Sequence, residues 1–476
     1  MKKYLSFLLC LLLTLGLVWV PAVQAAPAPE EEAVQSAEPT AKPEVKTEIF
    51  DTLEPPQCRS AVLMDAQSGQ VLYEDLAPGA ELHSYPASIT KVMTALLVLE
   101  AVDRGELGLE QTITASDTFG YDLEAGGTTQ DIKPGEELSV LDLLYCMLLP
   151  SANESSNILA EAVAGSIPAF VERMNERAAQ LGMEDTNFVN AHGLHNAGHY
   201  TTAYDLALLV RQALQNETFV TIVSSRSHEV PETNLSPKRR ITSTNALINP
   251  LYNGAYTYTK AIGVKTGSTS AAGKCLASAA QRGKDTLICI VLGAEEVKDD
   301  KGVLTRHQFS ESKRLLQWGF DHFERKALLS GNPVAEIPVE LSADTTAVAL
   351  KPAEIPEVML PTDMEPSKFQ QDITLYRETV EAPVEAGQAL GELTVRNGDT
   401  TYATVKLVAG ASAKRSAFLA WIQGIRNFFS QTWVKVGLVA LGLMLLLLII
   451  RFGVLGGRSK SRYNGRGRGG YRGRRR

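Results

Sequence analysis

Cysteine is scarce in this chain, with five in 476 residues, and no two are spaced as C-x-x-C. The sequence therefore supports neither a redox pair nor a zinc knuckle. Cys10 lies in the apolar N-terminal run, which leaves Cys58, Cys146, Cys275 and Cys289. Cys275 and Cys289 fall on neighbouring strands of an expected hairpin and could pair. A buried cysteine also serves as a small apolar residue, and we favour this second interpretation.

Two segments lack a whole class of side chain. Residues 26–46 are rich in Ala, Pro and Glu with almost no large apolar residues, so we expect a disordered linker. From Arg451 to the end there are ten Lys or Arg and no acid. Because the whole chain carries −8, residues 1–450 carry −18, and the two parts face different surroundings.

Arg-Gly repeats in the basic tail, residues 456–476, resemble nucleic-acid-binding segments. Next to an apolar helix, however, such a tail is more simply a topology signal that contacts anionic lipid. We therefore expect no nucleic-acid partner.

The N-terminus has the composition of a secretory signal. Met1–Lys3 is basic, residues 4–20 are apolar, and small residues surround Ala25. This order predicts a signal peptide over residues 1–25, with the mature chain starting at Ala26, although an uncut anchor is the alternative.

A second apolar run lies near the C-terminus. Val436–Ile450 is unbroken, and its flanks extend it to an expected transmembrane helix over 433–455. By the positive-inside rule, the basic tail is cytoplasmic and the large acidic part lies outside the cell membrane. Residues 411–432 carry apolar side chains at helical spacing and predict an amphipathic interfacial helix that contacts membrane lipid: Phe418, Leu419, Trp421, Ile422, Ile425, Phe428 and Phe429.

Between these ends, the length and the 45% hydrophobic content allow a sizeable core and two or three domains. We expect a catalytic domain over 47–328 that begins with a hairpin turning at Ser68-Gly69. Short alternating stretches between 329 and 410 predict a small β domain, with strands at Ile337–Val339, Ala347–Leu350, Ile373–Tyr376, Ala389–Val395 and Thr401–Val408.

Three short motifs follow one another at long range: Ser88-Ile-Thr-Lys91, Ser151-Ala-Asn153 and Lys265-Thr-Gly267. A Ser and a Lys three apart on a helix share a face, so the amine can take the hydroxyl proton. Each motif alone is weak, because Ser88 and Ser151 could be helix caps and Lys91 a surface residue. Their order, with separations of roughly 60 and 110 residues, is that of penicillin-binding proteins and serine β-lactamases.

The residues around Ser88 fit this chemistry. An apolar helix is expected over Ile89–Val102, and a hydroxyl at its N-terminus faces the positive end of the helix dipole. If the helix is buried, desolvation and the charge of Lys265 push Lys91 toward its neutral form, which can act as a base.

The chain also resembles a specific family. The stretches that carry the resemblance are Tyr85–Thr94, Leu148–Ser156, His192-Gly-Leu194, and Ile262–Ser268 with Ala271–Gly273. They are similar to the D-alanyl-D-alanine carboxypeptidases, the low-molecular-mass penicillin-binding proteins of serine peptidase S11 type. The likeness runs from about residue 49 to about residue 323, and less sharply to about 407.

The resemblance implies an α/β (α+β) catalytic domain of the β-lactamase or transpeptidase type. A mostly antiparallel sheet flanked by helices would be followed by a small all-β domain and the C-terminal transmembrane helix. It assigns catalysis to Ser88 as nucleophile, Lys91 as base and Ser151 as proton relay. Substrate binding falls to Asn153, Lys265, Thr266, Gly267 and Ser268 and, by a looser match, to Arg306.

The implied reaction is removal of the terminal D-alanine from peptidoglycan stem pentapeptides, with β-lactams trapping the same serine. No cofactor and no metal are expected: although His192, His195 and His199 have ligand-like spacing, His192-Gly-Leu194 matches the family's structural loop. The alternatives are a D,D-endopeptidase or β-lactamase on the same site, or a catalytically silent, membrane-tethered wall-binding protein.

Overall fold

The computed structural model describes residues 53–77, 82–123, 127–251, 254–298, 300 and 302–455. The predicted signal peptide, linker and basic tail lie outside these residues, so their boundaries stay predictions.

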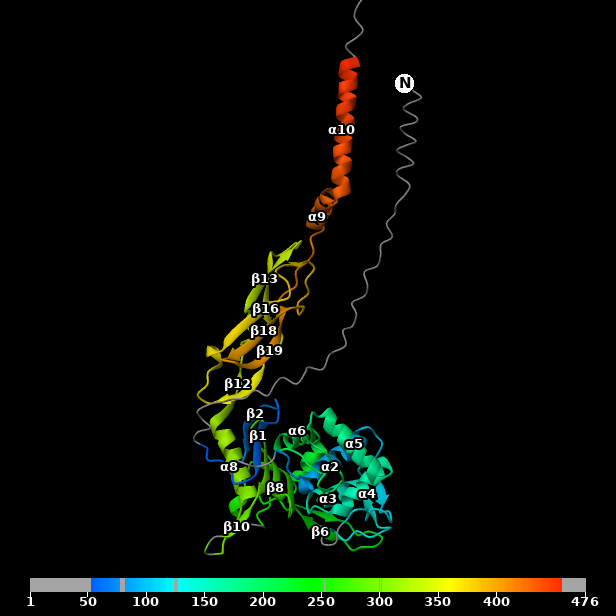
Figure 1. The fold of residues 1–476 in the computed structure, drawn as a ribbon, viewed down its shortest axis with the longest axis vertical. Coiled ribbons are helices and arrows are strands. Elements are labelled where there is room, and N and C mark those ends of the chain that lie inside the picture. Colours follow the sequence, from blue (N-terminus) through cyan, green and yellow to red (C-terminus); the bar gives the residue numbers. More distant parts are fainter. Residues whose placement is uncertain are drawn as a thin grey trace, which may run out of the picture. The chain divides into compact units, whose positions relative to one another are not determined.

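A five-stranded antiparallel sheet in the order β2-β1-β9-β8-β7 forms the centre of the first domain (Figure 1). Side chains alternate between the two faces of each strand, so Val62 and Met64 enter one core while Ala61 and Leu63 enter another. The strands are β1 (Ser60–Asp65), β2 (Val71–Leu76), β7 (Ala261–Thr269), β8 (Gly273–Arg282) and β9 (Asp285–Ala294). The turn at Gly69, with φ of 78°, lies where the sequence predicts it, and the expected hairpin that carries Cys275 and Cys289 turns at Gly283.

Helices cover both faces of this sheet. On one face, apolar side chains of six helices join the larger core; on the other, Leu315, Leu316 and Phe320 of α8 join the smaller one. The larger group comprises α2 (Lys91–Asp103), α3 (Val140–Leu148), α4 (Asn153–Ala164), α5 (Ile167–Gln180), α6 (Ala203–Ala213) and α7 (Glu217–Ser224), and α8 spans His307–His322.

Short elements complete the first domain. Two small hairpins pair β3 (Thr112–Thr114) with β4 (Glu137–Ser139), and β5 (Ser227–Val230) with β6 (Arg239–Thr242). A third pairs β10 (Glu296–Lys298) with β11 (Leu304–Arg306). The 3-10 helices are η2 (Ala87–Thr90) and η3 (Gly254–Tyr256).

The four cysteines in the described part of the chain are free, as the small-apolar interpretation predicts. Cys275 belongs to the larger core and Cys289 to the smaller one, so these two thiols lie on opposite faces of the sheet.

A separate β domain follows, with its own apolar core built around residues such as Ile337, Leu350 and Leu393. Its six-stranded sheet has the order β16-β18-β19-β14-β13-β17, and its β15 pairs with β12. The strands are β12 (Phe323–Ala327), β13 (Ala335–Glu340), β14 (Ala347–Pro352), β15 (Glu357–Pro361), β16 (Gln370–Leu375), β17 (Val380–Glu381), β18 (Ala389–Asn397) and β19 (Thr400–Ala409), with a 3-10 turn, η4, at Pro366–Lys368. All five predicted strands are present, whereas β12, β15 and β17 have no counterpart among the predictions.

Two helices end the described chain. In α9 (Ala417–Ser430) large apolar side chains such as Phe418, Trp421 and Phe429 are exposed. The next helix, α10 (Thr432–Leu455), includes one stretch, Thr432–Arg451, that is long and apolar enough to cross a membrane, with a mean hydropathy of 2.6. Only 6% of that stretch is buried.

Candidate active site

Ser88 lies in the 3-10 turn η2, directly before helix α2, where Lys91 is the first residue. The helical spacing of three brings the Lys91 Nζ to 3.0 Å from the Ser88 Oγ. Helical structure thus begins at Ala87, two residues before the predicted start, and ends at Asp103, one residue after the predicted end. The ordinary-cap interpretation of Ser88 is wrong, because Pro86 is the N-cap of η2 and Thr90 is the N-cap of α2.

Lys91 is fully buried and has three oxygen partners. Besides the Ser88 Oγ, its Nζ donates to the Asn153 Oδ1 at 2.7 Å and to the His192 backbone carbonyl at 2.6 Å. Both of these oxygens can only accept. A neutral amine has two N–H groups and one lone pair, so the two N–H groups stay with Asn153 and His192. The lone pair is then left for the Ser88 hydroxyl proton.

The electrostatics favour this neutral form. Burial, and then the charge of Lys265, lower the pKa of Lys91 well below its usual range, and nearby Glu154 opposes the shift. A buried ammonium loses its hydration, and a second cation nearby adds repulsion. The surface-residue alternative for Lys91 is wrong, and the amine is suited to accept a proton near neutral pH.

Two glycines allow the Ser88 turn to be enclosed. A Cβ added to Gly193 would lie 1.9 Å from the Ala87 carbonyl oxygen, and the φ of Gly193, 85°, already favours glycine. On strand β7, a Cβ at Gly267 would lie 3.0 Å from the Pro86 carbonyl oxygen. The glycines of two sequence motifs therefore let a loop and a strand approach the same turn.

Ser151 lies between helices α3 and α4 in the left-handed region, with φ of 76°. Ala152, not Ser151, occupies the N-cap position of α4, so the helix-cap alternative for Ser151 is wrong. Its Oγ is buried without a hydrogen-bond partner, and the residue lines the pocket beside Ser88. A buried hydroxyl with no protein partner at this place is available to a substrate.

Strand β7 supplies the wall that contains Lys265-Thr-Gly267. Lys265 is 1% exposed and donates from its Nζ to the Thr266 carbonyl at 2.9 Å. Burial lowers the pKa of Lys265 to about 7. The Thr266 and Thr244 hydroxyls are 2.6 Å apart. Both residues line the pocket, as do Gly267 and the exposed Ser268 on the same strand.

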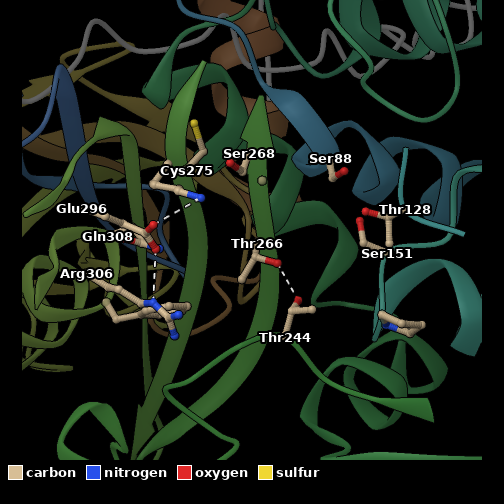
Figure 2. A pocket seen from close by; sticks show the side chains of 14 residues that line it. Ser88, Thr128, Ser151, Thr244, Thr266, Ser268, Cys275, Glu296, Arg306 and Gln308 are labelled. Atoms are coloured by element: carbon tan, nitrogen blue, oxygen red, sulfur yellow. Dashed lines mark hydrogen bonds and ion pairs between the residues drawn. The ribbon is translucent and has the colours of Figure 1, made fainter. Parts of the chain in front are cut away.

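These walls enclose a pocket of about 290 Å³. In Figure 2, Ser88, Ser151 and Thr128 lie on one side of strand β7, and Glu296 and Arg306 lie on the other. Arg306 therefore lines the pocket despite its loose sequence match. Lys91, Asn153 and Lys265 are buried beside the pocket and do not line it, although Lys91 contacts Ser88 and Asn153 directly.

Arg306 is part of an ion-paired group that the sequence analysis missed. Its Nε lies 3.1 Å from the Glu296 Oε1, across the β10–β11 hairpin, and the Lys274 Nζ lies 3.6 Å from the Glu296 Oε2. Gln308 also lines the pocket, and its Oε1 is buried without a partner. Only the strand register, which follows from the hairpin, brings Glu296 opposite Arg306.

The three histidines with ligand-like spacing in the sequence make hydrogen bonds or ring contacts within the protein. His192 is fully buried; its Nε2 lies 2.9 Å from the Asp122 Oδ1, and its Nδ1 accepts from the Leu194 N–H at 3.1 Å. His199 is also buried and hydrogen-bonded, and the His195 ring packs edge-on against Tyr85.

A hydroxyl beside a buried amine, a second unpartnered hydroxyl and a cationic wall around one pocket form a site suited to serine acyl transfer. The family comparisons agree with this class. Residues 51–296 match the model of the D-alanyl-D-alanine carboxypeptidases of the S11 peptidases, and residues 323–415 match the penicillin-binding protein 5 C-terminal domain. The chain belongs to this carboxypeptidase family.

Individual relatives are similar over most of their length. The D-alanyl-D-alanine carboxypeptidase DacC of Escherichia coli is 31% identical over 72% of this chain and 81% of its own. The D-alanyl-D-alanine carboxypeptidase DacF of Bacillus subtilis is 29% identical, and the match covers 77% of this chain and 88% of DacF. The crystal structure of penicillin-binding protein 5 from Haemophilus influenzae, 27% identical, covers 76% of this chain and 99% of its own, with a TM-score of 0.61.

Proposed function

We propose that this protein is a serine D-alanyl-D-alanine carboxypeptidase that removes the terminal D-alanine from peptidoglycan stem pentapeptides. One observation carries the proposal: the Ser88 Oγ lies 3.0 Å from the Nζ of a fully buried lysine whose N–H groups already have two carbonyl acceptors. Such an amine can activate the hydroxyl as a nucleophile.

In the acylation step, Lys91 takes the Ser88 proton while the Oγ bonds to the carbonyl carbon between the two D-alanines. The backbone N–H groups of Ser88 and Ser268 stabilise the oxyanion that forms. The proton that Lys91 took passes by way of the Ser151 hydroxyl to the departing nitrogen, so Lys91 becomes neutral again as the C–N bond breaks and D-alanine leaves. Water then hydrolyses the ester on Ser88.

Substrate binding falls to the other side of the pocket. Thr266 and Arg306, which both line the pocket, would bind the terminal carboxylate. Lys265, buried next to Thr266 on β7, would add its positive charge from behind the pocket wall. Gly267 keeps the strand close to the nucleophile, and the side-chain amide of Asn153 can donate to a substrate carbonyl while its oxygen holds Lys91. A β-lactam has the same carbonyl and carboxylate, so it should acylate Ser88 and inhibit.

For the rest of the chain we propose an exported enzyme anchored by one span. Residues 1–25 would be removed as a signal peptide and 26–46 would be a linker. The catalytic domain, 47–328, and the β domain, 329–410, would lie outside the cell membrane. The interfacial helix, 411–432, would contact lipid, 433–455 would span the bilayer, and 456–476 would be cytoplasmic. The ten cations and no acids from Arg451 onward support this orientation.

Release of D-alanine from a pentapeptide ending in D-alanyl-D-alanine tests the proposal. The detergent-solubilised wild type should release D-alanine and Ser88→Ala should not. Benzylpenicillin hydrolysis with multiple turnovers would instead show a β-lactamase, and cleavage only of cross-linked dimers an endopeptidase. Loss of all turnover in a folded wild type would favour the silent wall-binding protein.

A further inference from the structure

The residue before Ser88 has an unusual backbone. Ala87 lies in the left-handed region with φ of 48°, which a side chain with a Cβ adopts at a cost. This conformation sets the direction of the chain as it enters the Ser88 turn. Something in the surrounding structure must hold it, because a non-glycine residue would otherwise leave this region.

Thr90 holds the Ala87 carbonyl. The Thr90 hydroxyl is fully buried and donates to the Ala87 carbonyl oxygen at 2.8 Å. Gly193 packs against the same oxygen so closely that a side chain at this position would collide with it. The carbonyl therefore has a hydrogen-bond donor and a backbone neighbour that leave it little room to turn.

His199 sets the direction of the Thr90 hydroxyl. Its Nδ1 accepts from the Val189 backbone N–H at 3.2 Å, so its ring proton is on Nε2, which donates to the Thr90 Oγ1 at 2.9 Å. The Thr90 oxygen thus accepts from the ring, and its own proton is left for Ala87. Burial, with smaller effects from His192, His195 and Lys91, lowers the pKa of His199 to about 3, which keeps Nδ1 unprotonated near neutral pH.

We propose that His199 and Thr90 are positioning residues for Ser88: their hydrogen-bonded chain holds Ala87 in its left-handed conformation and so keeps the Ser88 Oγ within reach of the Lys91 Nζ. Neither side chain forms a hydrogen bond with the Ser88 Oγ, so both act through Ala87. This inference rests on the proposed function, in which Ser88 is the nucleophile.

Thr90→Val tests the hydrogen-bonded chain directly, because it removes the hydroxyl and keeps the shape of the side chain. Thr90→Ser keeps a hydroxyl at the same position. Ser278→Ala is the matched control: its hydroxyl is also fully buried and donates to a backbone carbonyl, that of Cys289, between two sheet strands. The measurements are the second-order rate constant for acylation of the detergent-solubilised full chain by a fluorescent penicillin, and the Tm.

We expect Thr90→Val to acylate roughly 10- to 100-fold more slowly, as small displacements of reacting groups have effects of this order. Thr90→Ser should acylate at a rate within about threefold of wild type. Ser278→Ala should lower the Tm by about as much as Thr90→Val does, without slowing acylation. With the pentapeptide, Thr90→Val should lower kcat and leave KM nearly unchanged. Acylation by Thr90→Val at the wild-type rate, or equal slowing by Ser278→Ala, would overturn the inference.

A second pair of variants tests the histidine. His199→Phe keeps a ring but removes the donor, whereas His199→Gln keeps an N–H that can reach Thr90. His199→Phe should acylate about tenfold more slowly, and His199→Gln should recover most of the rate. Equal rates in both folded variants would contradict the assignment. If the wild type itself is not acylated, the proposed function fails and this inference with it; normal wild-type acylation with unaffected variants overturns the inference alone.

Discussion

On one side of the active-site pocket, Ser88 contacts the fully buried Lys91 and lies in a turn that Gly193 and Gly267 approach closely. On the other side, Lys274, Glu296 and Arg306 form ion pairs whose side chains are 35%, 26% and 30% exposed. On the first side, Lys91 makes short hydrogen bonds to two carbonyl oxygens and is itself buried away from water. The second side consists of long side chains that water can still reach.

This difference separates chemistry from recognition. Buried hydrogen bonds fix positions and shift pKa values, which a proton transfer requires. Half-exposed ion pairs contribute only about 0–1 kcal/mol each, so Arg306 can exchange Glu296 for a substrate carboxylate at little cost. We therefore expect changes on the buried side to alter kcat and acylation, and changes on the exposed side to alter KM.

The largest effect should come from Lys91→Met, which keeps the length of the side chain and removes the base. We expect acylation to fall by roughly 10³-fold or more, in the range found for general bases. The measurement is the rate of penicillin adduct formation by the detergent-solubilised chain, with circular dichroism as the control for folding. A folded Lys91→Met variant with more than a tenth of the wild-type rate would show that the buried side does not supply the base.

The dependence of kcat/KM on pH should be bell-shaped. On the acid side activity rises with pH because Lys91 must lose its proton, and its lowered pKa allows this below its usual range. On the alkaline side activity falls above about 7 as Lys265, with a pKa of about 7, loses the charge that would bind the carboxylate. Lys265→Arg keeps the charge and should move only the alkaline limb upward; an unmoved limb would refute this role.

Arg306→Ala should raise the KM for the pentapeptide about tenfold, the effect of one charged hydrogen bond, and change kcat by less than about threefold. Steady-state D-alanine release measures both constants. Glu296→Gln is the partner variant: it frees Arg306 from its ion pair and should leave KM unchanged or lower it. A drop in kcat without a change in KM for Arg306→Ala would reverse the division between the two sides.

The smallest effect on activity should come from an ion pair outside the pocket. Arg325 on β12 is 5% exposed and binds the Asp65 Oδ1 at 2.7 Å and the Asp285 Oδ1 at 2.6 Å. Arg325→Ala leaves two carboxylates unpaired and should lower the free energy of unfolding by about 3 kcal/mol. Denaturant unfolding measures this loss, and acylation at 25 °C should stay within about twofold of wild type. A larger change in acylation would connect this ion pair to the site.

Local patterns in the sequence predicted what depends on local structure. The β8–β9 hairpin follows from alternation around Gly283, and the Ser88–Lys91 contact from helical spacing. Strand β12 was missed because its five residues, Phe323–Ala327, are mostly polar, and it forms only by pairing with β15 about thirty residues away.

The missed parts of the site depend on tertiary contacts. The His199–Thr90 bond joins residues 109 apart, and the sequence shows His199 only as one of three nearby histidines. The Glu296–Arg306 pair forms because β10 and β11 pair as a hairpin, which neither residue alone indicates. Ser151 has a left-handed conformation and is not the helix cap that the sequence offered as an alternative, because Ala152 is the N-cap of α4. No local pattern in the sequence determines these three features.

The position of the penicilloyl group tests the central claim most directly. Detergent-solubilised wild type, Ser88→Ala and Lys91→Met would be treated with benzylpenicillin, digested and mapped by mass spectrometry. We predict one adduct on the peptide that contains Ser88 in the wild type, none in Ser88→Ala, and only slow formation in Lys91→Met. An adduct on another residue, or an undiminished adduct in Ser88→Ala, would contradict the claim that the buried side carries the chemistry.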